Sequence, residues 1–417
     1  MHTCVDITDP TLPLRNCRTS GLANHPPERN RRSIRQALER HVNCRDDGMH
    51  CIAVRPLLVA AALVLIANTL ATSQELPAHE AWAALERGDA SKASAIFRDA
   101  LDRSPDNALL HYGIANASLG LGRTDAAIAS LKKAIERNPK FVQAMVLLAR
   151  VAYEAADLGL AVWSLEKAVA IVPGDRQLAG QLATWKKEAD LHQSFQARPG
   201  VRFNVLFEGP TQRAIGDRVS AVLESAYASV GKELDTYPSL ALEVILYSNQ
   251  QFQDITRAPA WAGGGYDGRI RLPVGNALRS PQTLDRIVIH EYVHSVVRTA
   301  AQTGVPAWIN EGLASHLEPG DKTWATRALQ ASPDRIRLED LVDGFGGMDG
   351  RLALIAYAES QIAAGLLIER LRPHVGPFLQ LLGNGHTVDQ ALSRHGVQPE
   401  AFYAEWRRRV GIRDDAR

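Results

Sequence analysis

The stretch His290-Glu291-Tyr292-Val293-His294 places two histidines four residues apart with a glutamate after the first. Residues with this spacing lie on one face of a helix, about 5–6 Å apart at their Cβ atoms, so both imidazole rings can reach one metal ion. Zinc is the usual metal for such ligands, and a catalytic zinc site combines three protein ligands with an open position for water. Glu291 stands where a carboxylate can accept a proton from that water. The stretch therefore predicts a catalytic metal site that needs a third ligand.

The candidate third ligand is Glu311, within the stretch Trp308-Ile309-Asn310-Glu311-Gly312-Leu313-Ala314. Ser280 and Pro281 are typical of a helix N-cap and first helical residue, and Pro306 opens a second helix that runs to about Leu317. Two helices joined by so short a connection run roughly antiparallel, which can return Glu311 to the histidines. The alternative, a third histidine six residues after His294, is excluded because that residue is Ala300.

The two motifs, His290-Glu291-x-x-His294 and Trp308-x-x-Glu311-Gly312-x-Ala314, resemble those of gluzincin metallopeptidases, specifically the bacterial peptidase-MA-like domains, over residues 200–412. The resemblance implies an α+β zincin-like domain in which His290, His294 and Glu311 bind Zn²⁺. It also implies that Glu291 is the catalytic base. Thermolysin-type relatives carry an aspartate four residues after the third ligand, whereas this chain has Ser315, so the hydrogen-bond partner of the ligands stays open.

Two further features of residues 200–412 bear on catalysis. Similar domains carry a tyrosine at the place of Tyr357, in a helix expected to run to about residue 371, and such a phenol can donate to the oxyanion of the attacked carbonyl. A packing tyrosine is the alternative. In Gly268–Leu272 polar and apolar residues alternate, and Pro273 follows, which is typical of an edge strand. In similar domains such a strand pairs with an extended substrate. A plain hairpin fits the same residues equally well.

The sequence before residue 200 repeats with a period of 34 from about residue 79. Prolines recur with this period at Pro105, Pro139 and Pro173. Small residues recur with the same period at Ala81, Ala115 and Ala149. This pattern resembles tetratricopeptide (TPR) repeats, in which each unit is a pair of helices. We expect three repeats and a capping helix over residues 79–197, whose concave surface binds a protein partner or substrate; a structural spacer is the alternative. The fold class is therefore multidomain, an all-α TPR solenoid followed by the α+β domain.

The N-terminal residues indicate export. Residues 1–48 are rich in Arg, Pro and Asn and are predicted to be disordered, and they arise from an over-extended reading frame if Met49 is the true start. Residues 49–73 have the basic start, apolar run and small residues of a signal peptide. Cleavage after Ser73 predicts a periplasmic or secreted protein, and an uncleaved segment predicts an inner-membrane anchor. All four cysteines lie in residues 4–51, so the cleaved product contains none, which suits an oxidising compartment.

The overall charge bears on the class of partner. The 47 basic and 46 acidic residues balance to a net charge of +1, which gives no bias toward nucleic acid or an anionic membrane.

Together, the motifs, the repeats and the N-terminal residues predict an exported zinc metallopeptidase that acts on a peptide or protein substrate. The alternative is a TPR-containing binding or assembly protein whose peptidase-like domain is catalytically inactive. We also expect a fragment of residues 198–417 to fold alone, unless the capping helix packs on it.

Overall fold

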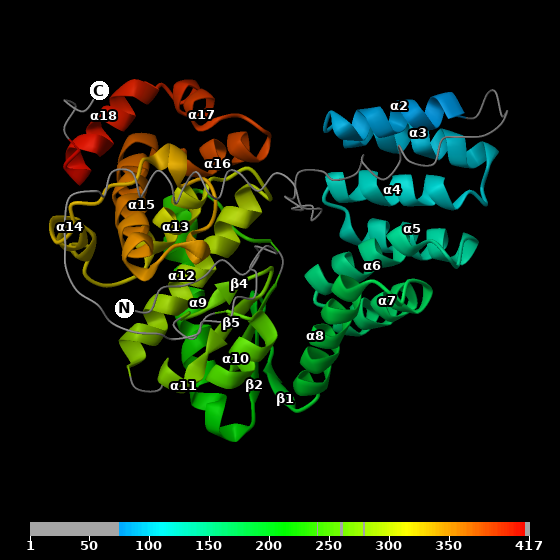
Figure 1. The fold of residues 1–417 in the computed structure, drawn as a ribbon, viewed down its shortest axis with the longest axis horizontal. Helices are drawn as coiled ribbons and strands as arrows, with labels where there is room; N and C mark the ends of the chain where they lie inside the picture. Colours follow the sequence, from blue (N-terminus) through cyan, green and yellow to red (C-terminus); the bar gives the residue numbers. More distant parts are fainter. Residues whose placement is uncertain (1–74, 240, 259–261, 278–279, 413–417) are drawn as a thin grey trace, which may run out of the picture.

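The computed structural model describes residues 75–412, apart from residues 240, 259–261 and 278–279. A module of stacked helices is followed by a mixed sheet surrounded by helices, and the chain passes from one to the other through helix α8 and strand β1 (Figure 1). The predicted disordered segment at residues 1–48 and the predicted signal peptide at residues 49–73 lie outside the described residues.

The stacked helices form three successive pairs with the predicted period. Small residues at the recurring positions let the helices approach closely, and Ala81, Ala115 and Ala149 are fully buried. Each predicted proline, such as Pro105 after the helix that ends at Arg103, lies two residues beyond a helix end. The helices are α2 (Glu75–Glu86), α3 (Ala90–Arg103), α4 (Ala108–Gly120), α5 (Thr124–Arg137), α6 (Val142–Glu154) and α7 (Leu158–Ile171).

The turn inside each pair requires a left-handed backbone. Gly88 and Gly122 have φ angles of 80° and 67°, which glycine adopts without steric cost. Ala156 stands at the same place in the third pair with a φ of 62°. The third turn therefore carries strain that the first two avoid.

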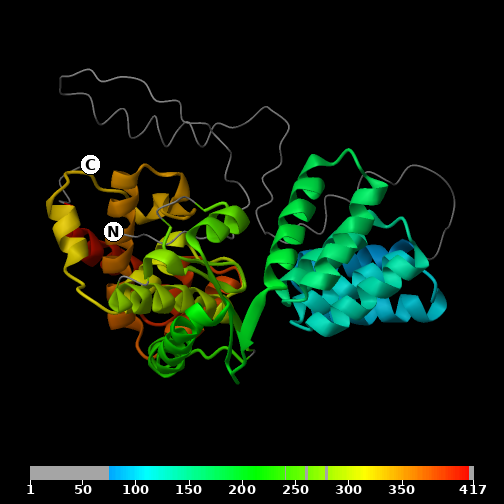
Figure 2. The ribbon, with the colours of Figure 1, turned by 90° about the horizontal axis from the view of Figure 1, so that it is seen from below.

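The solenoid ends in helix α8 (Arg176–His192), which packs on α7 and contacts the α+β part through α10 (Asn249–Thr256). The aromatic ring of Trp185 in α8 stacks on that of Tyr153 in α6, with 4.3 Å between the ring centroids. The second view, Figure 2, shows α8 between the other repeat helices and the sheet. The capping helix thus packs on the α+β part, the contact on which the independent folding of residues 198–417 depends.

The sheet has the strand order β1-β2-β3-β5-β4. Its three inner strands are parallel, and the two outer strands pair antiparallel with their neighbours. The strands are β1 (Phe195–Arg198), β2 (Phe203–Glu208), β3 (Leu242–Tyr247), β4 (Gly265–Tyr266) and β5 (Ile270–Pro273). Strand β1 lies in the segment that we expected to close the repeat module, so the sheet begins five residues before the expected boundary at residue 200.

The expected edge strand was misplaced by one strand. Residues 270–273 form β5, which pairs with β3 on one side and with β4 on the other. The outermost strand is therefore β4, at Gly265–Tyr266, and the hairpin alternative describes residues 265–273 correctly. We call residues 265–273 the β4–β5 hairpin. The error has a physical source, since a strand of two residues has too little alternation to be recognised.

The two faces of the sheet bury different clusters. Val244 and Leu246 of β3 face the main core, which also contains apolar residues from the two stretches that carry the candidate metal ligands. The alternate residues Ile245 and Tyr247 face a smaller cluster that Leu191 of α8 joins. The remaining helices are α9 (Arg213–Leu234), α11 (Val274–Ala277), α12 (Pro281–Ala300), α13 (Ala307–Leu317), α14 (Trp324–Gln330), α15 (Gly350–Leu371), α16 (Val375–Gly383), α17 (Val388–Arg394) and α18 (Pro399–Val410), with short 3-10 turns at Pro210–Gln212, Leu338–Asp340 and Phe345–Gly347.

Helix α15 is the long apolar helix that the sequence predicts. Among the described residues it alone is long and apolar enough to cross a membrane by length and composition, and 78% of its most apolar window is buried inside the protein. It packs closely on α13, because a Cβ atom added at Gly312 would lie 2.3 Å from the carbonyl oxygen of Ser360. The glycine that follows Glu311 in the sequence motif thus has a packing role.

Candidate metal centre

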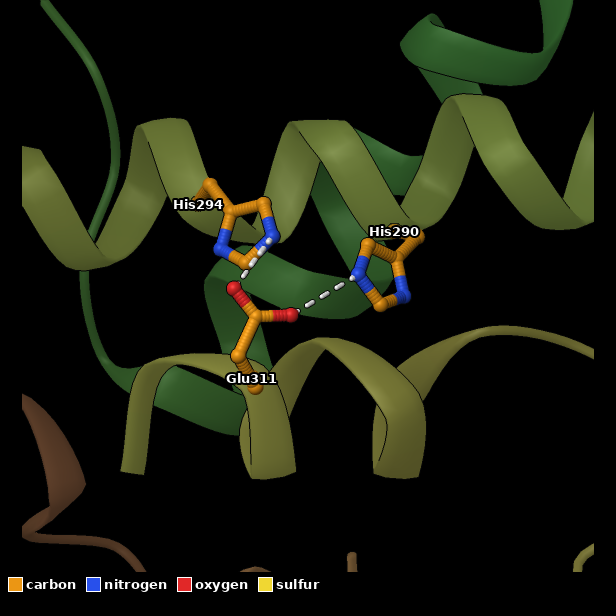
Figure 3. Close-up of side chains that lie close together, drawn as sticks. All are labelled: His290, His294 and Glu311. Carbon is orange, nitrogen blue, oxygen red and sulfur yellow. Dashed lines mark ion pairs between the residues drawn. The ribbon is translucent and has the colours of Figure 1, made fainter. Parts of the chain in front are cut away.

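Helices α12 and α13 carry the three candidate ligands. Ser280 caps α12 by accepting a hydrogen bond from the amide of Thr283, and Pro281 is the first helical residue, as predicted. Pro306 precedes α13 as its N-cap. His290 and His294 project from α12 toward Glu311 of α13 (Figure 3).

The ligand atoms converge on one point. The Nε2 atom of His290 lies 3.5 Å from Oε2 of Glu311, and Nε2 of His294 lies 3.7 Å from Oε1 of the same carboxylate. One ligand atom from each residue lies within 4.8 Å of the other two, and all three residues are buried. Tetrahedral zinc with bonds of about 2.1 Å separates its ligand atoms by about 3.4 Å. The spacing therefore fits such an ion.

The other ring nitrogens are held by residues that point the rings at the centre. Nδ1 of His290 lies 3.0 Å from Oε2 of Glu318, and Nδ1 of His294 lies 3.0 Å from Oδ1 of Asn310. An ionised carboxylate only accepts, so Nδ1 of His290 carries a hydrogen, which leaves Nε2 to face the centre. Ligating histidines have this arrangement in metalloproteins.

Glu318 fills the place that Ser315 left open. Its carboxylate also accepts from Arg286, at 3.1 Å and 3.2 Å, and its side chain is 8% exposed. Glu318 lies outside the two sequence motifs and was not predicted as this partner. The available signal was its spacing, since seven residues are two helical turns and place Glu318 on the side of Glu311.

The charges around His290 favour the protonated form of its ring when no metal is bound. Burial disfavours the charged ring, but the nearby carboxylates of Glu311 and Glu318 outweigh it and raise the pKa of His290 to about 10. Burial acts against ionisation of Glu311 too, yet the two histidines hold the pKa of its carboxyl below the usual range. Nε2 of His290 and Oε2 of Glu311 are both buried without a hydrogen-bond partner among the described residues. A bound cation would coordinate both atoms and would replace the proton on the ring.

Glu291 is fully buried beside the ligand pair. The chain approaches it at Gly264, where an added Cβ atom would lie 2.8 Å from Oε1 of Glu291. The glycine-rich turn before the β4–β5 hairpin thus gives the carboxylate its room, which sequence reasoning did not foresee.

Tyr357 belongs to the same centre. It is 5% exposed on α15, and its side-chain hydrogen bond is one of the factors that lower the pKa of Glu311. Its ring meets that of Phe345 edge to face, at 5.1 Å between centroids. The structure therefore places the candidate oxyanion donor beside the third ligand, at a position that also belongs to the main core.

Comparisons with known proteins identify the helical module. Two tetratricopeptide-repeat family models match residues 84–131 and 112–176. A tetratricopeptide repeat and J domain-containing co-chaperone of Fusarium oxysporum is 26% identical over 209 residues, 45% of this chain and 40% of that protein. Tetratricopeptide repeat protein 33 of Xenopus laevis is 26% identical over 125 residues, 30% of this chain and 48% of its own length. The chain thus spans less than half of these two relatives.

Comparison with solved structures found similar helical repeat proteins. The Sgt2 TPR domain from Aspergillus fumigatus is 22% identical and covers 31% of this chain and 87% of its own, with a TM-score of 0.28. The first TPR of Spaghetti, bound to an HSP90 peptide, is 15% identical and covers 28% of this chain and 95% of its own, with a TM-score of 0.27. The predicted repeats are confirmed, and the helical module preceding the sheet is a tetratricopeptide-repeat solenoid.

Proposed function

We propose that this protein is an exported, zinc-dependent metallopeptidase of the gluzincin type whose TPR solenoid binds a protein partner or the protein substrate. The observation that carries the proposal is the buried triad, in which Nε2 of His290, Nε2 of His294 and the carboxylate of Glu311 face one point. Glu318 and Asn310 hold the other ring nitrogens, so the rings are already oriented. Such preorganisation favours a metal site over a chance cluster.

The residues around the triad suit peptide hydrolysis. Zinc, when bound, acts as a Lewis acid and lowers the pKa of water at its open position. Glu291 is buried beside His290, where it accepts the proton of the attacking water and later passes it to the leaving amine. Tyr357, next to Glu311, donates a hydrogen bond to the oxyanion of the attacked carbonyl.

The repeat module adds recognition to this chemistry. Solenoids of this kind present an extended concave surface to their partners. A TPR-bound peptide in a similar structure and a co-chaperone among the similar proteins agree with a protein partner. Export rests on the apolar stretch at residues 56–67 and the small residues before Gln74.

Replacement of the base tests the catalytic claim. We expect Glu291→Gln to keep its zinc and to lose at least about a hundredfold of the cleavage rate, because an amide does not accept the water's proton. Labelled casein and a mixed peptide library serve as substrates. Glu339→Gln, the same change at an exposed position, is the control and should match the wild type.

The alternative is a TPR-containing binding protein with an inactive peptidase-like domain. It predicts that wild type and Glu291→Gln are equally inactive on every substrate. That result, obtained with zinc-loaded protein, would overturn the catalytic proposal and leave the TPR module as the functional part.

A further inference from the structure

A buried cluster of charges joins the TPR solenoid to the β4–β5 hairpin. Its centre is Glu188 of α8, which is fully buried and accepts from Arg271 at 2.7 Å and from Arg269 at 3.2 Å. Tyr153 of α6 donates its hydroxyl to Glu188 at 2.8 Å and accepts from Arg271 at 2.7 Å. Helices α6 and α8 of the solenoid thus hold Arg271 of β5 and Arg269 of the turn before β5. We call these four residues the Glu188 cluster.

The cluster fixes its members closely. Arg271 is fully buried, and it also donates to Asp267 at 2.9 Å and to the hydroxyl of Tyr247 at 2.7 Å. Arg269 donates to the backbone carbonyl of Tyr153 and lies over its ring, 4.4 Å from the centroid. Buried charges tolerate little displacement, because each lost contact leaves a charge without water or a partner. The side chains of the hairpin are therefore anchored on the solenoid.

The hairpin in turn borders the candidate metal centre. Arg271 is paired directly with Gly265 across the β4–β5 ladder. Gly264, the next residue back, is where an added Cβ atom would lie 2.9 Å from Cγ of Glu291. A continuous path of contacts thus runs from Glu188 through Arg271, β5 and β4 to the carboxylate that we assign as the base.

We propose that Glu188 is a positioning residue, which holds the β4–β5 hairpin in register beside Glu291. The inference rests on the proposed peptidase function for its catalytic consequence. The solenoid is then part of the construction of the site as well as a recognition surface. The side-chain partners of Glu188 are the two hairpin arginines and the residues around them, so its effect on Glu291 passes through the hairpin.

The test compares Glu188→Gln with a control at the same junction. Lys187 of α8 and Asp254 of α10 form an ion pair at 2.7 Å, in which the lysine side chain is 57% exposed. Asp254→Asn removes this contact between the solenoid and the α+β part but leaves the Glu188 cluster intact. Tyr153→Phe is a milder third variant, which removes one hydroxyl and keeps the ring that stacks on Trp185.

Hydrogen exchange followed by mass spectrometry reads the hairpin without requiring activity. In the full-length, zinc-loaded protein we expect peptides from residues 262–273 to exchange at least about tenfold faster in Glu188→Gln than in the wild type. Peptides from α12 and the zinc content should be unchanged. Asp254→Asn should match the wild type throughout. Equal exchange of the hairpin in Glu188→Gln and wild type would overturn the proposal, as would loss of zinc from Glu188→Gln.

Steady-state kinetics on a cleaved peptide separate positioning from a loss of folded protein. A smaller folded fraction lowers the rate per total chain but leaves kcat per bound zinc unchanged, whereas a displaced hairpin misplaces Glu291 and lowers kcat per bound zinc by about tenfold or more. An unchanged kcat per bound zinc in Glu188→Gln would count against the inference. If the wild type itself does not cleave, the peptidase proposal fails, and the exchange experiment alone decides whether Glu188 holds the hairpin. If Glu188→Gln does not fold, Tyr153→Phe must show the same changes at smaller size.

Discussion

At the scale of single residues, Glu318 decides how well His290 is held. It accepts from Nδ1 of His290 and is itself paired with Arg286. Replacement by glutamine keeps the size and removes the charge, so we expect Glu318→Gln to weaken zinc binding about 10–100-fold, the usual effect of losing such a partner. Competition with a zinc-chelating dye measures the change.

The control for this prediction is the position where thermolysin-type relatives carry aspartate. Ser315 is buried, but neither histidine is hydrogen bonded to it. Ser315→Ala should therefore bind zinc within about threefold of the wild type, since small polar changes away from the ligands matter little. A large loss in Ser315→Ala with none in Glu318→Gln would show that the partner is assigned wrongly.

The proton held by the metal-free centre gives a second prediction at this scale. The pKa of His290 is raised to about 10, so the metal-free protein carries this proton near pH 8 and gains stability from it. That stability is fully present below the unfolded pKa of about 6.5 and is lost as the pH rises through about 10. Zinc binding at pH 8 should release about one proton from His290. Calorimetry in two buffers with different ionisation enthalpies counts the protons, and the number should be smaller in Glu318→Gln.

At the scale of elements, the third turn of the solenoid is the strained one. Ala156 has a φ of 62° where Gly88 and Gly122 stand in the other pairs. The left-handed region costs an alanine about 1–2 kcal/mol, and glycine loses about 0.5–1 kcal/mol through chain entropy. Ala156→Gly should therefore stabilise the solenoid by about 0.5–1 kcal/mol, measured by denaturant unfolding followed by circular dichroism.

The reverse change at the equivalent turn is its control. Gly122 has φ 67° and no atom within 4 Å of an added Cβ, so only the backbone is strained in Gly122→Ala. We expect a loss of about 1 kcal/mol from that variant. Equal stabilities of all three proteins would show that the turns do not limit the solenoid.

The elements also show what a sequence can and cannot reveal. The spacing of His290 and His294, the cap at Ser280 and the 34-residue period are local patterns, and each predicts its element because helix geometry repeats along the chain. Strand β4 has two residues and β1 four, which leaves too little alternation to recognise. The pairing of Glu188 with Arg271 spans 83 residues, and neither charge signals its partner.

At the scale of the whole molecule, the solenoid and the sheet are joined more firmly than the linker-like Arg198-Pro199-Gly200 suggests. Strand β1 pairs with β2, and Leu191 and Phe195 pack in the cluster that contains Tyr247. A fragment of residues 198–417 loses these contacts, except the pairing of Arg198 with Val205. A fragment of residues 175–417 keeps them.

We therefore expect residues 198–417 to unfold at a temperature about 5–10 °C lower than residues 175–417. Exposure of several apolar side chains costs a few kcal/mol, and about 1 kcal/mol lowers the midpoint of a domain this size by about 2–4 °C. Thermal unfolding of both zinc-loaded fragments measures the difference. Equal midpoints would show that the α+β part is independent of the capping helix, as the sequence alone suggested.

The central claim is that His290, His294 and Glu311 bind one zinc ion. Elemental analysis of the purified full-length protein after dialysis against a weak chelator tests it most directly. We predict close to one zinc per wild-type chain and less than about a tenth of that in Glu311→Ala, because two imidazoles alone bind weakly and the buried ligand atoms then lack their third partner. Glu339→Gln should keep the full complement. A wild-type protein without zinc, or a Glu311→Ala protein that retains it, would contradict the claim.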